Sequence, residues 1–191
     1  IRHSINTADD FYDKENDYCD EISPLLYGFS TDFYEALVTS KFRKELEDKY
    51  GKFLFDQAEC SLKTFSEEVI PQLQEENKLS SKYDKLIASA KIPFDGEERT
   101  LSQMVPYTQS KDRNIRKDAT KKVAEFFSAN KHEFDEIYDK LVKVRTEIAH
   151  KLGFKNYVEL AYARLRRLDY NAQDVAGYRK QVLENIVPLH S

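Results

Sequence analysis

The run KLGFKNYVELAYARLRRLDY, residues 151–170, decides how the last third of the chain folds. Gly153 is the residue type that most easily takes the left-handed conformation at a helix end, so one helix is expected to stop there. Asn156 is a favourable N-cap for the next helix, and Glu159 three residues later completes a capping box. Asp169 and Asn171 mark a second turn. The run therefore predicts a helix, a tight stop, a new capped helix and another turn.

Outward from this run, most of the chain has apolar side chains at the three- and four-residue spacing of amphipathic helices. The stripes occupy residues 7–38, 40–54, 64–90, 115–126, 134–152 and 171–186. The first stripe consists of Phe11, Tyr18, Ile22, Leu25, Phe29, Phe33 and Leu37. Pro24 is expected to kink or split that helix, and Gly51 is expected inside the second one. Thr64 and Glu67 form a capping-box pattern before the third helix, with Pro71 near its start.

The regular helical spacing is interrupted once, near residues 91–100. Ile92 and Phe94 alternate before Asp95-Gly96, a favoured hairpin turn, so a short hairpin and a lone turn are both compatible with the pattern. Thr100 and Gln103 are expected to cap a short helix that ends by Pro106.

These patterns together predict the fold class and the organisation of the chain. The class is all-α, a mainly helical array of antiparallel helices with one short β-hairpin or turn near residues 91–100. Residues 1–191 are expected to form a single helical region. Within it we expect a helical N-terminal part at 1–90, the hairpin or turn and capped helix at 91–103, and a second helical part at 110–191.

Composition limits the classes of partner. Charged residues make up 34% of the 191 residues and the net charge is −4, so the chain has no general attraction to nucleic acid or anionic membrane. No apolar run approaches the roughly 20 residues of a membrane span. The two cysteines, Cys19 and Cys60, fit reduced thiols, which favours a cytoplasmic location. The absence of an initiator Met and of a clear final stop signal predicts a piece of a longer chain.

Two pairs of residues have spacings that occur in metal sites. His132-Glu133 begins like the His-Glu-x-x-His motif of zinc peptidases, but Glu136 stands where the second histidine is needed. One interpretation is that His132 and Glu136 share a metal ion. The better supported one is that the acids of this segment are there because a helix N-terminus favours negative charge. Glu147 and His150 have the Glu-x-x-His spacing of di-iron bundles, which need a second such motif that is not found here.

A basic and aromatic cluster follows Gly153. Arg164, Arg166 and Arg167 lie beside Tyr162 and Tyr170, and guanidinium groups bind phosphate or a peptide carboxylate. Ion pairing with neighbouring carboxylates, of which Asp169 is the obvious candidate, is the simpler interpretation. Neither cysteine has a histidine nearby in sequence that would mark it as a nucleophile. The residues by themselves identify no catalytic site and no metal site.

The same stretch carries a resemblance to a known family, which extends in family order over most of the chain. The matching runs in the C-terminal part are LGFKNY (152–157), ELAYARL (159–165), RLDYNA (167–172) and VAGYRKQV (175–182). Earlier ones are ELE (45–47), YG (50–51), EENKL (75–79), IPFDG (92–96), TLSQ (100–103) and SKDR (110–113) with Arg116. In these runs the chain resembles the oligoendopeptidase F family of thimet-oligopeptidase-like zinc metallopeptidases.

The resemblance implies a parent protein that is a cytosolic zinc endopeptidase for oligopeptides. Its helices would wall a channel, and its zinc ligands would lie in a His-Glu-x-x-His helix plus a further Glu, downstream of the residues matched here. There the motif Glu would deprotonate a zinc-bound water. No catalytic or metal residue is then expected in this chain, and zinc is expected in the parent alone. A channel or structural role is expected for the family-motif residues Tyr157, Tyr162, Arg164, Asp169 and Tyr170.

The implied partner is an oligopeptide substrate of the parent, with no nucleic acid and no membrane; the oligomeric state is not predicted. An alternative is a non-enzymatic helical module that binds a protein or peptide. An exposed apolar groove would favour that alternative.

Overall fold

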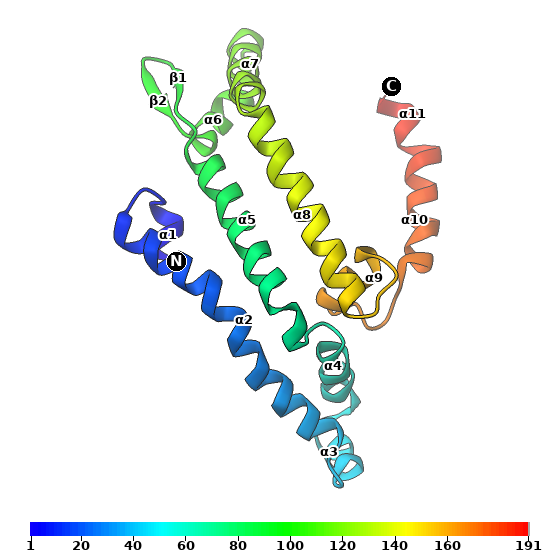
Figure 1. The fold of residues 1–191 in the computed structure, drawn as a ribbon. Coiled ribbons are helices and arrows are strands. Elements are labelled where there is room, and N and C mark those ends of the chain that lie inside the picture. Colours follow the sequence, from blue (N-terminus) through cyan, green and yellow to red (C-terminus); the bar gives the residue numbers. More distant parts are fainter. Residues whose placement is uncertain (191) are drawn as a thin grey trace. The chain divides into compact units, whose positions relative to one another are not determined.

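The computed structural model describes residues 1–190, which are mainly helical with one two-stranded sheet (Figure 1), as the sequence predicts. The first elements are α1 (Arg2–Ile5), α2 (Asp10–Val38), α3 (Arg43–Tyr50), α4 (Lys52–Leu62), the 3₁₀ turn η1 (Glu67–Val69) and α5 (Ile70–Ala88). They are followed by β1 (Ile92–Phe94), β2 (Glu97–Arg99), α6 (Leu101–Thr108), α7 (Arg113–Ala129), α8 (Lys131–Lys151), α9 (Tyr157–Arg164), α10 (Ala172–Asn185) and α11 (Val187–His190).

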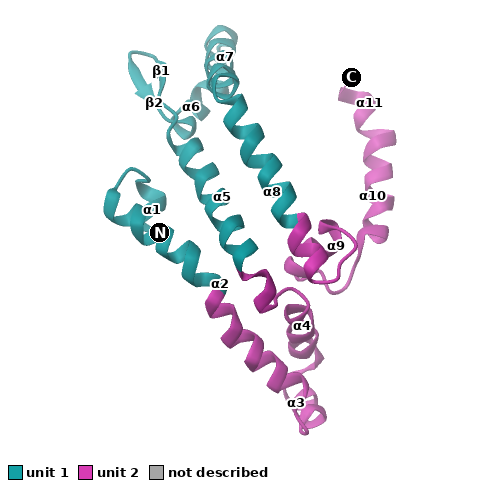
Figure 2. Cartoon of the chain, in the orientation of Figure 1, with its two compact units in different colours: residues 1–24, 71–145 teal, residues 25–70, 146–191 magenta. Residues whose placement is uncertain are grey.

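The chain forms two compact units, each built from two separate parts of the sequence (Figure 2). Unit 1 comprises Ile1–Pro24 and Pro71–Arg145, and unit 2 comprises Leu25–Ile70 and Thr146–Ser191. Three long helices, α2, α5 and α8, are divided between the units, so each contributes one portion to unit 1 and one to unit 2.

Unit 1 contains a small lobe in which the hairpin packs on α6 and α7. Its centre is formed by Ile92, Met104 and Ala119, which are at most 3% exposed. Half-buried hydrophobic side chains surround this centre: Phe94, Leu101, Tyr107, Val123 and Phe126. The hydrophobic effect of joining hairpin and helices therefore holds residues 92–126 together.

The hairpin is confirmed, with Ile92 opposite Arg99 and Phe94 opposite Glu97. Both turn residues have positive φ, 54° at Asp95 and 77° at Gly96, as the favoured two-residue turn requires. The guanidinium group of Arg99 lies 4.8 Å from the ring centre of Tyr107, and the Tyr107 hydroxyl donates a 2.9 Å hydrogen bond to Asp95. That hydrogen bond raises the pKa of Tyr107.

In unit 2, α4 packs on α9. Phe55 and Ala58 of α4 and Leu160 of α9 are fully buried. The Cys60 thiol donates a hydrogen bond of 3.3 Å to the carbonyl oxygen of Ala163, which joins the same two helices. Burial raises the pKa of Cys60, so this cysteine is a structural thiol.

Pro24 does not break its helix: α2 runs without interruption from Asp10 to Val38. A proline lacks the N–H that would bond the carbonyl oxygen four residues earlier, here that of Asp20. The side-chain amide of Asn77 donates to this oxygen at 3.1 Å, and that of Gln74 donates to Glu21 O at 2.7 Å. Side chains of α5 therefore supply the bond that the proline removes, which sequence spacing did not reveal.

Other helix boundaries also differ from the expectation. Gly51 has φ of 86° and separates α3 from α4, where one helix was predicted. Thr64 does not cap, because its hydroxyl donates to Ser61 O and the N-cap position before η1 is Ser66. The helix after Thr100 has its capping box with Gln103, but it continues past Pro106 to Thr108.

The stop predicted at Gly153 is present, whereas α9 ends at Arg164, before the turn predicted at Asp169 to Asn171. The two helix ends have the same hydrogen-bond pattern. After α8, the N–H groups of Gly153 and Phe154 bond back to His150 O and Ala149 O. After α9, those of Arg166 and Arg167 bond back to Ala163 O and Tyr162 O. This is the Schellman motif, whose turn residue is left-handed; φ is 82° at Gly153 and 52° at Arg166.

Capping of the helices that begin after these stops agrees with the sequence in most respects. The Asn156 side chain accepts from the N–H groups of Val158 and Glu159. The Glu159 carboxylate accepts from Lys155 N at 3.4 Å instead of from Asn156, so the predicted reciprocal bond is displaced by one residue. Asn171 caps α10 with a complete box through Asp174.

The two Schellman motifs predict opposite effects of substitution. Arg166→Gly should raise the free energy of unfolding by about 0.5–1 kcal/mol, because the left-handed strain of an L-residue exceeds the extra entropy of glycine when unfolded. Gly153→Ala should lower it by about 1 kcal/mol by the same reasoning. A methyl group at position 153 meets nothing within 4 Å, so no steric clash contributes. Urea denaturation followed by circular dichroism measures both, and changes of equal sign would contradict this account.

Candidate functional site

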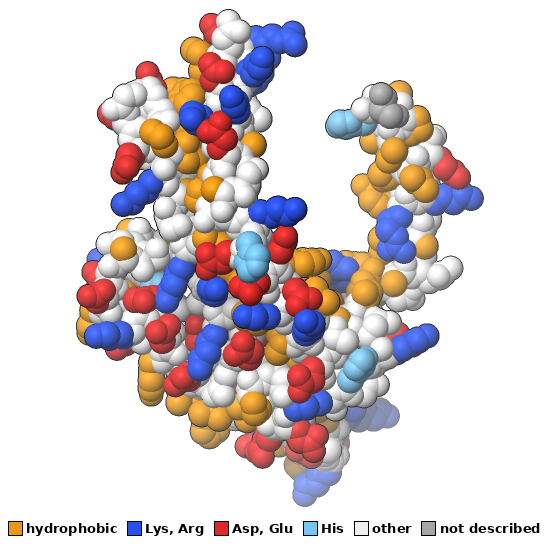
Figure 3. Space-filling view, turned by 45° about the horizontal axis from the view of Figure 1, so that its top comes forward, with side chains coloured by type: hydrophobic (Ala, Val, Ile, Leu, Met, Phe, Trp, Pro, Cys, Tyr) orange, Lys and Arg blue, Asp and Glu red, His pale blue; other side chains and the backbone are white. Residues whose placement is uncertain are grey.

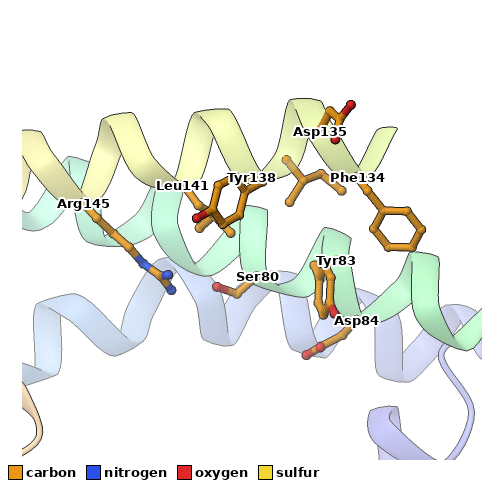
Figure 4. Close-up of a pocket in the computed structure, with 9 residues that line it drawn as sticks. Ser80, Tyr83, Asp84, Phe134, Asp135, Tyr138, Leu141 and Arg145 are labelled. Carbon is orange, nitrogen blue, oxygen red and sulfur yellow. The ribbon is translucent and has the colours of Figure 1, made fainter. Parts of the chain in front are cut away.

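A concave surface between α5 and α8 of unit 1 is the candidate site (Figure 4). Its volume is about 630 Å³, within the range of ligand pockets. Its lining residues are Ser80, Tyr83 and Asp84 from α5, and Phe134, Asp135, Ile137, Tyr138, Leu141 and Arg145 from α8.

The wall of the pocket is largely aromatic. The rings of Tyr83 and Phe134 meet edge to face with centroids 5.9 Å apart, so their orientation is fixed by packing. Tyr138 projects from α8 with 71% of its surface exposed. Rings of this kind offer contact area to the apolar side chains of a ligand, because little conformational entropy is lost when they are covered.

The two ends of the pocket carry opposite charge. Arg145 lies at one end, and Asp84 and Asp135 lie toward the other, beside Tyr83 and Phe134 (Figure 4). The Nε of Arg145 donates to Glu76 at 2.7 Å, and Glu76 is 9% exposed, so the guanidinium group is held in place. Neither Asp84 nor Asp135 belongs to an ion pair within residues 1–190.

The arrangement suits binding and supplies no catalytic pair. Aromatic rings between charges of opposite sign can hold a peptide by its apolar side chains and its charged groups. The lining contains no histidine, and Ser80 is its single hydroxymethyl group. The sequence did not single out this pocket. Tyr138 lies beside the apolar stripe of α8. A large aromatic residue next to such a stripe is the sequence signal that could have indicated the pocket.

The family-motif residues lie in unit 2, where two of the five come together. The rings of Tyr162 and Tyr170 are 6.1 Å apart, and the Arg167 guanidinium group lies 4.5 Å from the first ring centre and 5.7 Å from the second. Tyr157 begins α9 and Arg164 ends it. The cation–π contacts fix the turn after α9.

The ion pair suggested for Asp169 with Arg166 or Arg167 is absent from the part of the chain that the structure describes. Asp169 is exposed, and neither Arg166 nor Arg167 makes an ion pair with it in the described part of the chain. Because Arg166 occupies the left-handed position, the chain turns there and Arg167 faces the tyrosine rings.

The residues considered as metal ligands are dispersed. His132 is in the first turn of α8 and His150 in its last turn, and both are exposed. Glu147 lies 3.4 Å from Lys151. Across residues 1–190, no three side chains of His, Cys, Asp or Glu are grouped so that they could hold a metal ion. The residues present therefore do not fit a catalytic zinc, which needs three protein ligands.

Comparison with known proteins shows what the whole chain is similar to. The family model of the peptidase M3 N-terminal domain matches residues 1–65. A solved Bacillus anthracis chain named as an oligoendopeptidase F is 59% identical, with a TM-score of 0.93. A second chain named as an oligoendopeptidase F is 57% identical with a TM-score of 0.94, and a PZ peptidase A solved with an inhibitor is 57% identical with 0.93.

The coverage of these matches is unequal. They include 98–99% of this chain but only 34–35% of the solved chains. The chain therefore spans about a third of the length of the proteins it matches. The comparison with curated proteins gave no match. Within residues 1–190, none of the helices combines the length and the apolarity that crossing a membrane requires.

Proposed function

Because this chain belongs to the oligoendopeptidase F family of M3 peptidases, we propose that it forms a helical, non-catalytic part of a zinc-dependent oligoendopeptidase. The complete enzyme would hydrolyse internal bonds of oligopeptides in the cytoplasm. The zinc ligands and the general base belong, in this proposal, to the part of the protein that these residues do not include.

One observation carries the proposal, namely identity of 57–59% across nearly every residue of the chain to solved chains named as oligoendopeptidase F or PZ peptidase A. The distribution of potential ligands is consistent with a supporting role, since a catalytic zinc would not fit the residues present. These two facts support the proposal that catalysis belongs to another part of the protein.

Within that role, we assign the pocket between α5 and α8 to contact with the peptide. Tyr83 and Tyr138 would cover apolar side chains of the substrate, and the opposed charges of Arg145 and Asp135 would orient its backbone. Tyr157, Tyr162, Arg164, Asp169 and Tyr170 would shape the channel wall through the fixed turn after α9.

The proposal is tested with the complete chain and an internally quenched oligopeptide. Cleavage at an internal bond is expected, with loss of activity on chelation and recovery on addition of zinc. A folded protein that contains the same cleavable sequence should not be cleaved. Activity that survives complete chelation would contradict the zinc dependence. Cleavage of the folded protein would contradict the assignment as an oligopeptidase.

A binding module without chemistry is the second candidate, and the exposed apolar face of α2 favours it. Sequencing the complete reading frame that contains these residues distinguishes the two candidate functions. A His-Glu-x-x-His helix encoded in the same frame supports the peptidase, and its absence supports the module.

A further inference from the structure

The charges that line the pocket between α5 and α8 do not cancel. Its basic residue, Arg145, donates from Nε to the carboxylate of Glu76, which is 9% exposed, so the positive charge already has a partner. The two acids of the lining, Asp84 and Asp135, form no ion pair in the part of the chain that the structure describes. The pocket therefore contains two negative charges that no basic residue matches.

Two other acids of α8 have basic partners, unlike the two in the pocket. Glu133 lies 3.2 Å from Lys82, and Asp139 lies 2.6 Å from Lys143. Acidic and basic side chains are also interspersed over most of the face drawn in Figure 3. A mixture of both signs is the ordinary state of a solvated surface, whereas unmatched acids beside the low-dielectric wall of a pocket create a local negative potential.

The aromatic side chains beside these acids are fixed by packing. Phe134 contacts Phe127 and Phe126, with ring centroids 5.4 Å and 6.4 Å apart, and Tyr83 meets Phe134 edge to face. Tyr138 lies one turn further along α8, with 71% of its surface exposed (Figure 4). Because the face of an aromatic ring carries negative charge density, exposed rings of this kind attract cations. The rings and the carboxylates therefore favour the same sign of ligand.

The combination restricts the occupant to a cation with an apolar stem. A metal ion does not suit the pocket, because it needs several oxygen ligands and residues 1–190 contain no group of three side chains that could hold one. The terminal amine of a peptide has the charge but no stem to cover the rings. An arginine or lysine side chain has both, since its methylene groups cover apolar surface while its charged end stays polar. Arginine fits best, because its planar guanidinium group stacks on aromatic rings and pairs with carboxylates.

We propose that this end of the pocket is a subsite for a basic side chain of the peptide, in which Asp84 and Asp135 attract the charged group and Tyr138 covers the stem. The inference rests on the proposed function, because it takes an oligopeptide as the ligand, and it adds a sequence preference. Asp84 belongs to the wall formed by α5 and Asp135 to that formed by α8, so a basic side chain between the helices is attracted from both. Exposed ion pairs and cation–π contacts are individually weak, so we expect a preference for arginine of about tenfold.

The preference is measured with the complete chain and internally quenched peptides that contain one arginine, placed at successive positions. Citrulline is the matched replacement, because it has the shape of arginine and lacks the charge. At one position, kcat/KM should be about tenfold higher for arginine than for citrulline. A ratio of one at every position would overturn the inference.

Two variants assign the preference to the pocket. In the double variant Asp84→Asn, Asp135→Asn the ratio of kcat/KM for arginine over citrulline should fall to nearly one. Both side chains are exposed, so their replacement leaves the packing of the helices intact. Asp139→Asn is the control, because it removes an acid of the same helix that already pairs with Lys143, and the ratio should not change. A preference that persists in the double variant, or that Asp139→Asn removes equally, would overturn the inference.

Two further measurements separate the possible sources of failure. If acetylation of the peptide's terminal amine lowers kcat/KM about tenfold while citrulline has no effect, the pocket binds the amine and the inference is wrong. Binding of the arginine and citrulline peptides to the chelated protein is measured by fluorescence anisotropy, which needs no turnover. An inactive chain that binds the arginine peptide about tenfold more tightly refutes the proposed function and supports the subsite. An active chain that shows no preference in either assay refutes the subsite alone.

Discussion

Residues 1–191 produced alone should hydrolyse no oligopeptide when zinc is added, whereas the complete chain should hydrolyse it at least about 10⁶-fold above the uncatalysed rate. Zinc peptidases need three protein ligands and an open position for water. The four histidines occupy separate places in the described residues. His3 contacts Asp13 at 3.1 Å, His132 and His150 lie at opposite ends of α8, and His190 ends α11.

The measurement compares the two polypeptides at equal concentration, with the same quenched peptide and the same zinc titration. Circular dichroism of residues 1–191 first establishes that the helices have formed, so that loss of activity is not caused by unfolding. A zinc-dependent turnover that copurifies with residues 1–191 and increases in proportion to their concentration would contradict the division of labour.

Local signals in the sequence predicted several helix ends correctly. Asn156 and Asn171 cap as expected, and Gly153 and the Asp95-Gly96 turn have the positive φ that their residue types favour. Each of these features depends on hydrogen bonds within a few residues, so the neighbouring sequence contains all the information needed.

Features that depend on distant residues were missed. The continuity of α2 through Pro24 requires Asn77, which is 53 residues away and donates to the free carbonyl oxygen of Asp20. The apolar spacing continues across Gly51 and predicts an unbroken helix there, yet the backbone takes φ of 86° at this residue. Periodicity records which side chains share a face and does not record whether the backbone beneath them is unbroken.

The sequence did not indicate the pocket between α5 and α8, and the role expected for the family-motif residues stays a prediction. The tyrosine and arginine cluster after α9 is ordered as a unit, but by stacking of Arg167 on Tyr162 and not by a pair with Asp169. The pocket residues Tyr83 and Tyr138 are 55 residues apart in sequence, and only the packing of α5 on α8 brings them together. The same applies to the exposed apolar side chains of α2, because the face of the helix that packs on α5 decides which of them are covered.

Replacing Phe55 by alanine should lower the free energy of unfolding by about 3–5 kcal/mol, a large part of the 5–15 kcal/mol typical of a domain. Phe55 is fully buried, and the guanidinium group of Arg43 lies 5.3 Å from its ring centre while bonding to Glu59 at 2.7 Å. Removing the ring leaves a cavity that these neighbours cannot fill, because the ion pair holds Arg43 in place.

Phe53 on the same helix provides the control, because the chemical change is identical and its side chain is 64% exposed. In residues 1–191, Phe53→Ala should change the free energy of unfolding by no more than about 0.5 kcal/mol, as surface substitutions usually do. Urea denaturation of both variants, with Phe55→Leu as the conservative replacement, measures the difference. Equal losses at positions 53 and 55 would mean that α4 packs through a different face from the one observed.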